Sequence, residues 1–406
     1  MAEVYDVVIS GGGPAGTSAA IGLKNSGLKV LLLEKHVFPR DKICGDALSP
    51  DVWRQLLQLQ VPIDEIRSFT EKIPSYGARV SSPSGDLVEF EFPDMEEDLA
   101  PGYISERFRF DHYMWKMAAD SNVVDARDGV TVKGAHWNGK RWKVETSRGA
   151  FESRMLFIAD GAQSILAKQM GQLVVEREHY CAGLRQYWHG VQGFHEKGFI
   201  ELHFEKEIIP GYFWMFPLPN GNANVGIGML SSKIAEKKVD LKKHMHRLIH
   251  EHPDFAPRFK DAEPLEKVKG WGLPIGSKKR VISGDHFVLL GDAASVIDPA
   301  TGEGIGNSIR TGRVAAAVVP ELLKARKTSA KDLKAYDEEV YRRMWSELKW
   351  SRALQNMLKY PGIINYTVRK SNRNETVRKI ISGSLTEIEL RKNIYNPLFY
   401  LKLLLN

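Results

Sequence analysis

The first 34 residues constrain the fold of this 406-residue chain more than any other segment. Their apolar pattern predicts a buried strand over Val4–Ser10, a helix over Pro14–Asn25 and a second buried strand over Lys29–Leu33. Two strands joined by one helix form a β-α-β unit, in which the strands run parallel and the helix covers one face. The chain therefore opens as an α/β fold.

The turn between the first strand and the helix has the glycine spacing of a dinucleotide site. Gly11 allows a sharp turn, Gly13 lets a pyrophosphate approach the backbone, and Gly16 lets the helix pack closely on the strand. A lone motif of this kind is weak evidence. Here it lies between a predicted strand and a predicted helix, and this context makes it specific for dinucleotide binding.

The residues around this turn complete the predicted dinucleotide site. The helix starts at Pro14 and Ala15, where free N–H groups and the positive end of the helix dipole favour phosphate. Glu34 ends the second strand and is followed by Lys35. An acid at this position accepts a ribose hydroxyl in such sites. FAD and NAD both remain open at this point.

Composition narrows the class of protein. Hydrophobic residues make up 43% of the chain and charged residues 26%, which is typical of a globular protein and excludes wholesale disorder. The two cysteines, Cys44 and Cys181, are too few for a disulfide scaffold or a cysteine-rich zinc or iron–sulfur module. No metal site is expected, because the histidines of residues 244–252 lie among basic side chains.

A second set of motifs selects FAD. A buried strand ends at Gly291-Asp292, and a helix opens with a glycine-rich start that follows soon after. This arrangement resembles the flavoprotein superfamily of the para-hydroxybenzoate hydroxylase type. The resemblance implies that Asp292 holds the ribityl chain and that the helix start faces the flavin N1–C2=O edge. The implied contacts at this helix start are Pro299, Gly302, Gly304 and Ile305.

Two further segments extend this resemblance. Asp160-Gly161 is similar to the superfamily's Asp-Gly motif, and Arg107 begins an Arg-x-x-Phe-Asp segment. The resemblance implies that both segments lie near the cofactor. A second glycine fingerprint for NAD(P)H is missing from the sequence. We therefore expect bound FAD, with NAD(P)H or another electron donor binding only transiently.

Two loops indicate one branch of this superfamily. Cys44-Gly45, within residues 42–50, resembles the Cys-Gly loop of FAD-dependent geranylgeranyl reductases. Residues 211–217, followed by 225–228, resemble their Tyr-x-Trp-x-Phe-Pro segment and its Val-Gly-x-Gly continuation. In that family the aromatic strand lines a tunnel for a polyprenyl chain. Flavin halogenases carry a Trp-x-Trp-x-Ile-Pro segment, which this chain matches poorly.

The aromatic strands also support an apolar pocket without the family resemblance, because aromatic side chains on one sheet can wall such a pocket. Packing in the core is the alternative for each of them. The aromatic residues in question are Tyr187, Trp188, Phe199, Phe204, Tyr212, Phe213, Trp214 and Phe216.

The resemblance implies three catalytic candidates. Cys44, in a loop expected near the flavin, is a candidate proton donor or lid residue, with a small buried cysteine as the alternative. Tyr212 is a second candidate donor, with strand packing as its alternative. Trp214 lies in the same aromatic segment and completes the set.

We therefore predict an α/β fold in which a Rossmann-like FAD-binding domain of the glutathione reductase/hydroxylase type carries an inserted antiparallel β-sheet substrate domain and a helical C-terminal tail. The predicted segments are 1–75, 100–178 and 272–328 for FAD, 76–99 and 179–271 for substrate, and 329–406 for the tail. Within these segments, single helices are expected over residues 109–119, 233–251 and 304–323.

The leading hypothesis for function is an FAD-dependent oxidoreductase that reduces carbon–carbon double bonds of an apolar, prenyl or lipid substrate. One alternative is an FAD monooxygenase that hydroxylates an aromatic or quinone precursor. Another is a non-catalytic flavin- or lipid-binding protein.

The C-terminal part of the chain is basic. Residues 321–406 hold 18 Lys and Arg against 9 Asp and Glu, whereas the rest of the chain has a net charge of −2. The chain ends in an apolar segment, residues 396–406, beside basic residues, which is typical of an interfacial anchor. Packing on its own domain is the alternative. We expect a cytoplasmic protein with peripheral contact to the inner face of the membrane, no nucleic-acid partner and an oligomeric state that the sequence leaves open.

Overall fold

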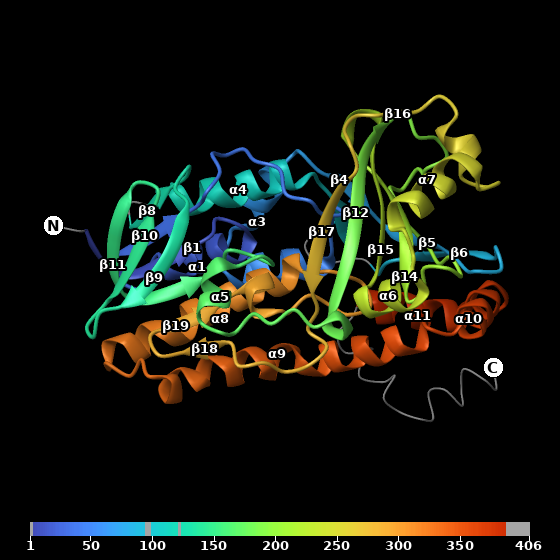
Figure 1. The fold of residues 1–406 in the computed structure, drawn as a ribbon. Helices are drawn as coiled ribbons and strands as arrows, with labels where there is room; N and C mark the ends of the chain where they lie inside the picture. Colours follow the sequence, from blue (N-terminus) through green and yellow to red (C-terminus); the bar gives the residue numbers. More distant parts are fainter. Residues whose placement is uncertain (1–2, 94–98, 121–122, 387–406) are drawn as a thin grey trace.

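The structure is a computed structural model that describes residues 3–93, 99–120 and 123–386. Two large β-sheets stand side by side, and long C-terminal helices run beneath both of them (Figure 1). None of the described helices is both long enough and apolar enough to cross a membrane.

The first sheet contains the predicted β-α-β unit. Strand β1 (Val4–Ser10) pairs in parallel with β2 (Val30–Leu33) on one side and with β11 (Gly149–Ile158) on the other, and α1 (Pro14–Leu23) joins β1 to β2. Strand β2 and residues 7–10 of β1 are buried, as their largely apolar sequences predict, whereas Val4 at the start of β1 is 37% exposed. The other strands of this sheet are β8 (Val124–Arg127), β9 (Val132–Trp137), β10 (Trp142–Thr146), β18 (Ser283–Gly284) and β19 (Phe287–Leu289).

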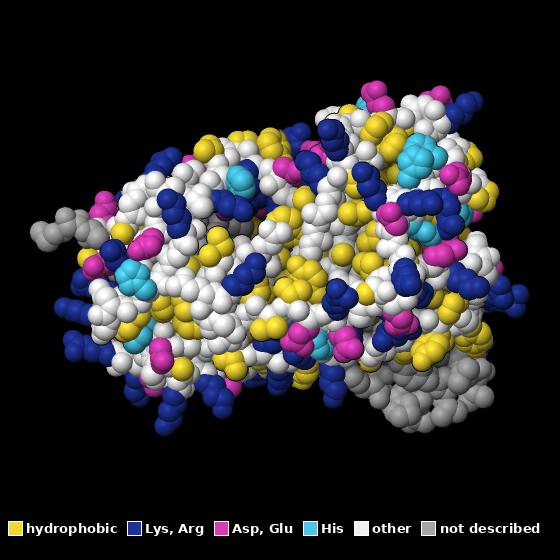
Figure 2. Space-filling model, in the orientation of Figure 1, with side chains coloured by type: hydrophobic (Ala, Val, Ile, Leu, Met, Phe, Trp, Pro, Cys, Tyr) yellow, Lys and Arg dark blue, Asp and Glu magenta, His cyan; other side chains and the backbone are white. Residues whose placement is uncertain are grey.

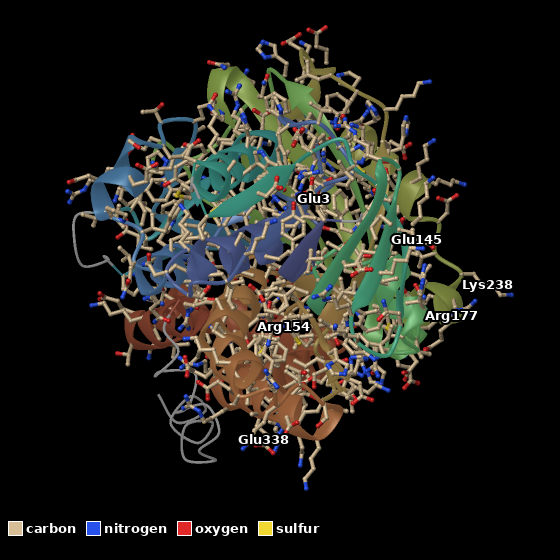
Figure 3. All side chains as sticks on the ribbon, turned by 90° about the vertical axis from the view of Figure 1, so that its left-hand side faces the viewer. Glu3, Glu145, Arg154, Arg177, Lys238 and Glu338 are labelled. Atoms are coloured by element: carbon tan, nitrogen blue, oxygen red, sulfur yellow. The ribbon has the colours of Figure 1, made fainter. Side chains whose placement is uncertain are left out.

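Two helices cover this sheet and cross each other closely. A side chain on Gly312 of α8 (Ile305–Lys324) would place its Cβ 2.2 Å from Ser18 Oγ of α1. Arg154 of β11 ties the same layers together, because it pairs with Asp6 of β1 at 3.0 Å and donates to the Leu323 carbonyl of α8. Figure 3 labels Arg154 where the sheet meets the C-terminal helices.

The second sheet is mostly antiparallel. Its central strand β14 (Gly211–Pro217) alternates, so that Phe213 and Met215 pack toward α7 (Leu241–Glu251) while Trp214 faces the other way. The remaining strands are β5 (Gly77–Ser81), β6 (Leu87–Glu91), β12 (Tyr180–His189), β13 (Ile200–His203), β15 (Asn222–Leu230), β16 (Glu263–Pro264) and β17 (Lys269–Pro274). Strand β17 passes the predicted domain boundary at residue 271.

The expectation of one helix over residues 233–251 is wrong. The structure has α6 (Ser231–Lys237) and then α7. Lys238 takes a left-handed conformation with φ 53°, which ends α6, and the Asp240 side chain caps α7 by accepting from the Lys243 N–H. This cap satisfies an N–H group at the start of α7 and favours a new helix over a continuous one. Lys238 extends from the surface in Figure 3.

The other predicted helices form with small shifts at their ends. Helix α4 (Arg107–Ala119) starts two residues earlier than expected, which places Arg107 in its first turn. The remaining elements are α2 (Pro50–Gln58), α3 (Ile63–Ser68), α5 (Ile165–Gln169), and a small sheet of β3 (Ala47–Leu48), β4 (Ile73–Ser75) and β7 (Gly102–Ile104).

The C-terminal region is helical as far as it is described. Helix α9 (Ala330–Met357) starts with a capping box between Ser329 and Asp332 and runs along both halves of the molecule (Figure 1). Helices α10 (Pro361–Arg373) and α11 (Glu375–Thr386) follow. The apolar segment 396–406, predicted to contact a membrane, lies outside the described residues.

Candidate active site

A cavity of about 930 Å³ opens between the carboxyl ends of the first sheet and one face of the second sheet. Sixteen of the eighteen predicted cofactor residues line it; the other two are Gly16 and Gly291. The catalytic candidates Cys44, Tyr212 and Trp214 also line it. Figure 2 shows hydrophobic side chains gathered where the two halves of the molecule meet. The cavity thus joins two regions that are far apart in the sequence.

The glycine turn has the geometry that phosphate binding requires. A Cβ on Gly11, whose φ is +112°, would lie 2.3 Å from the Ala159 carbonyl oxygen, and one on Gly16 would lie 1.9 Å from the Gly11 carbonyl oxygen. These two glycines allow close packing within the turn. In contrast, the atom nearest to a Cβ on Gly13 would be Arg40 Nη2, at 3.8 Å. Gly13 therefore leaves open space in front of the α1 N-terminus.

Glu34 is fixed by backbone N–H groups at the end of β2. Its two carboxylate oxygens accept from Gly12 at 2.9 Å and from His36 at 3.1 Å, and Arg40 lies 3.8 Å away. The carboxylate is buried in the wall of the cavity beside Lys35. This position suits a ribose contact, a role that stays a prediction.

Two further acids border the cavity. Burial raises the pKa of Asp160, and its Oδ1 atom has no hydrogen-bond partner among the described residues. Such a buried acceptor needs a donor, which a ligand hydroxyl would supply. Asp292 follows Gly291, which adopts a left-handed φ of 58°, and lies 3.7 Å from Lys42 Nζ.

The start of α8 supplies a second helix N-terminus. Gly302 has a φ of 72° and Gly304 is the N-cap, which provides no side chain to satisfy the first N–H groups of the helix. Pro299 and Ile305 line the cavity at the same place. The open glycine turn, the unpartnered Asp160 oxygen and this uncapped helix start together fit FAD.

Arg107 and Cys44 lie side by side in the cavity wall. Arg107 Nε and Nη2 donate to Asp111 at 2.7 and 2.8 Å, and the guanidinium also interacts with the Cys44 thiol. Burial opposes ionisation of Asp111, but Arg107 and Arg40 hold its pKa below the ordinary value. The Cys44 thiol is therefore next to a fixed positive charge.

Asn224 connects the Cys44 loop to the aromatic strand, a link that sequence reasoning missed. Its amide nitrogen donates to the Cys44 carbonyl and to Asp46 Oδ2, both at 2.7 Å. Its amide oxygen accepts from Trp214 Nε1 at 2.9 Å. Asn224 is fully buried. The one signal in the sequence was a polar residue inside an apolar strand.

Asp46 is the second residue that was missed. Its carboxylate is fully buried and also accepts from the Tyr187 hydroxyl at 2.7 Å. Burial raises the pKa of Asp46 to about 7, although Arg185 acts in the opposite direction. The residue adopts a φ of 69°, which is uncommon for aspartate. These contacts fix the loop that carries Cys44 and Gly45.

Only one face of β14 lines the cavity. Of the eight aromatic residues considered, Tyr212, Trp214 and Phe216 lie in the cavity wall. A Cβ on Gly226 would lie 2.2 Å from the Trp214 ring, so a glycine on β15 gives this indole its space. Trp188 and Phe213 pack under α7 instead.

Tyr212 and α9 hold the turn that precedes α8. The Tyr212 hydroxyl donates to the Thr301 carbonyl, and Gln355 of α9 donates to the Pro299 carbonyl. The Ala300 N–H donates to Ser351 Oγ at 2.9 Å. The C-terminal region therefore reaches the predicted flavin site, a contact that no local sequence pattern indicated.

Comparisons with known proteins show which family this chain belongs to. The family model of the geranylgeranyl reductase catalytic domain matches residues 181–271, and that of FAD-dependent oxidoreductases matches residues 6–39. Menaquinone reductase of Mycobacterium tuberculosis is 31% identical over 79% of this chain and 77% of that protein. Digeranylgeranylglycerophospholipid reductase of Methanocaldococcus jannaschii is 29% identical over 87% of this chain and 88% of that protein.

Solved structures give the same fold. A geranylgeranyl bacteriochlorophyll reductase-like protein from Thermoplasma acidophilum superposes with a TM-score of 0.81 at 25% identity, covering 97% of this chain and 99% of that chain. A flavin-dependent brominase superposes with a TM-score of 0.75 at 18% identity, a likeness that shows the fold alone.

The fold and the cavity thus define an FAD-dependent oxidoreductase. Within that class, the chain belongs to the geranylgeranyl reductase family, whose members are FAD-dependent reductases of prenyl and lipid substrates. The enzyme takes an apolar small-molecule substrate.

Proposed function

We propose that this enzyme reduces carbon–carbon double bonds in the prenyl chain of a membrane lipid or a prenylated quinone. The observation that carries the proposal is the apolar cavity wall of Tyr212, Trp214 and Phe216, which faces the predicted FAD residues. Ile200 and Leu202 of β13 continue this wall. An apolar surface of this kind suits a long hydrocarbon chain.

The residues of the chain have separate tasks in this reaction. FAD, held by the glycine turn and by the residues around Asp160 and Asp292, supplies the hydride equivalent when it is bound and reduced. Trp214 and Phe216 hold the substrate chain and exclude water. Asn224 keeps the Trp214 indole and the Cys44 loop in fixed relative positions.

The proton comes from Cys44 or Tyr212 in this proposal. Burial raises the pKa of Tyr212, so its hydroxyl stays protonated at neutral pH, but that hydroxyl is engaged with the Thr301 carbonyl. The Cys44 thiol lies beside Arg107 in the cavity wall, whereas the Tyr212 hydroxyl is committed to a backbone carbonyl. This difference favours Cys44 as the donor.

We also propose a cytoplasmic location, with the basic C-terminal tail in peripheral contact with the inner face of the membrane. The charge of residues 321–406 and the apolar end of the chain support this location. Electrons arrive from NAD(P)H or another donor that binds transiently, since one glycine fingerprint serves FAD.

Mass spectrometry tests the proposed reaction. Purified, chemically reduced enzyme is incubated with a lipid and quinone extract, once without oxygen and once in air. The proposal expects a prenylated species that gains pairs of hydrogen atoms without oxygen. A species that gains an oxygen atom only in air would contradict it and favour a monooxygenase. No change in either sample would favour a carrier.

A further inference from the structure

Helix α10 has two faces of different character. Ile364 and Val368 are buried and pack against β6 of the second sheet. On the outer side, Tyr360, Ile363 and Tyr366 are 63%, 37% and 43% exposed. Single exposed apolar residues are common on proteins, but Ile363, Tyr366 and the N-cap residue Tyr360 lie within seven residues and form a patch.

Basic side chains continue this patch along the helix. Ile363, Tyr366, Lys370 and Arg373 follow one another at intervals of three or four residues, so they share one side of α10. Arg373 is exposed and Lys370 is half-buried. We call Tyr360 and these four residues the α10 surface.

Basic side chains outnumber acidic ones around the α10 surface. Residues 348–374 contain six Lys and Arg and no Asp or Glu, although acidic residues number 50 in the whole chain. Asp86 offsets part of this charge, because it pairs with Arg369 at 2.7 Å and lies near Arg373. This part of the molecule is therefore complementary to an anionic surface.

The α10 surface also lies close to the substrate end of the cavity. The buried side of α10 belongs to the same apolar cluster as Ala78, Ile200 and Tyr212, which line the cavity. A bilayer that binds the outer side of α10 would therefore lie on the opposite side of this helix from the apolar cluster.

We propose that the α10 surface docks on an anionic lipid bilayer. Tyrosine side chains are favoured at the level of lipid headgroups, and Lys and Arg attract anionic lipids. Ile363 supplies apolar area that can enter the interface. The inference rests on the lipid substrate of the proposed function and goes beyond it by naming a docking face distinct from residues 396–406.

Vesicle flotation of the full-length enzyme tests this proposal. The probes are vesicles of phosphatidylglycerol mixed with phosphatidylcholine, and vesicles of phosphatidylcholine alone. We expect the enzyme to float with the anionic vesicles and to be released by salt. Reversal of two charges in the double variant Lys370→Glu/Arg373→Glu should weaken this binding by about tenfold or more. The double variant Ile363→Ser/Tyr366→Ser should also weaken it.

A matched variant separates the local effect from net charge. Lys242→Glu/Lys243→Glu makes the same change in charge on α7, whose two lysines are exposed and which lies at the other end of the second sheet from α10 (Figure 1). Its binding to anionic vesicles should stay close to that of the unmodified enzyme. Circular dichroism checks that each variant folds.

Several results would overturn the docking proposal. Equal loss in the α7 and α10 variants would assign binding to net charge, and unchanged binding of both α10 variants would assign it to residues 396–406 or to another face. A loss of self-association without a change in flotation would identify a second copy as the occupant.

Reductase activity on detergent-dispersed substrate should be the same in all variants. If the unmodified enzyme shows no reductase activity, that result would count against the proposed function and leave the flotation result intact.

Discussion

At the scale of single residues, the side chain of Asn224 links three groups of the site by hydrogen bonds. It is buried and bonds to the Cys44 carbonyl, the Asp46 carboxylate and the Trp214 indole. Replacement by leucine keeps the branched shape but leaves the Cys44 carbonyl and the Trp214 indole without this partner, while Asp46 keeps the bond from Tyr187. We expect Asn224→Leu to lower the free energy of unfolding by about 3 kcal/mol, since each unsatisfied buried group costs about 1–3 kcal/mol.

The control for this variant is Asn222→Leu on the same strand. Asn222 is only half-buried and its side chain meets the exposed His189, so its loss should cost about 1 kcal/mol or less. Urea denaturation measures both variants. Equal costs would show that the bonds of Asn224 add little to stability. A folded Asn224→Leu enzyme should also show a lower kcat, because Trp214 and the Cys44 loop lose their shared anchor.

Asp46 should make stability depend on pH in a particular direction. Its pKa in the folded protein is about 7, whereas the ordinary value is 3.8. Between these values the folded state retains a proton that the unfolded chain has lost, so the contribution of Asp46 to stability falls as pH rises. Asp46→Asn should remove this slope in urea denaturation measured across the window. Identical slopes in both proteins would contradict the assignment.

At the scale of elements, two glycines of the turn are needed for different reasons: Gly13 for binding phosphate and Gly16 for packing. Gly13→Ala has space for its methyl group, so the fold should stay intact while bound FAD is lost from the purified protein. Gly16→Ala meets the Gly11 carbonyl oxygen at 1.9 Å, which should destabilise the fold by about 1–3 kcal/mol or more. Flavin absorbance and melting temperature separate the two effects. Full FAD content in a stable Gly13→Ala protein would contradict phosphate binding at this turn.

The aromatic strand β14 also needs a glycine on the neighbouring strand β15. A methyl group at Gly226 would lie 2.2 Å from the Trp214 ring, whereas one at Gly228 meets nothing nearer than 3.6 Å. Gly226→Ala should therefore displace Trp214 and destabilise the protein by about 1–3 kcal/mol, and Gly228→Ala should be nearly neutral. Thermal unfolding and tryptophan fluorescence measure the pair. Similar behaviour of the two variants would show that β15 tolerates a shift at this point.

Local patterns in the sequence predicted these elements well. The features that such patterns missed were missed for a physical reason. The β-α-β unit depends on neighbouring residues, so periodicity and glycine spacing were sufficient to find it. The bond between Asn224 and Asp46 joins positions 178 residues apart. The break at Lys238 depends on a single capping aspartate within a basic, helix-favouring segment. Neither feature has a periodic signal.

At the scale of the whole molecule, α9 joins the two halves of the site. Its residues Ser351 and Gln355 hold the turn before α8, while α10 continues from it to the outer edge of the second sheet. The cofactor site, the substrate wall and the α10 surface therefore belong to one connected arrangement. This long-range arrangement also explains why the C-terminal region looked like a separate tail in the sequence.

The most direct test of the central claim follows the bound flavin and the substrate in one experiment. Enzyme with reduced FAD is mixed without oxygen with a lipid that carries geranylgeranyl chains. We expect the absorbance of oxidised flavin to return, with one pair of hydrogen atoms gained by the lipid for each flavin oxidised. Flavin that stays reduced until air is admitted, followed by oxygen incorporation, would contradict the assignment as a double-bond reductase.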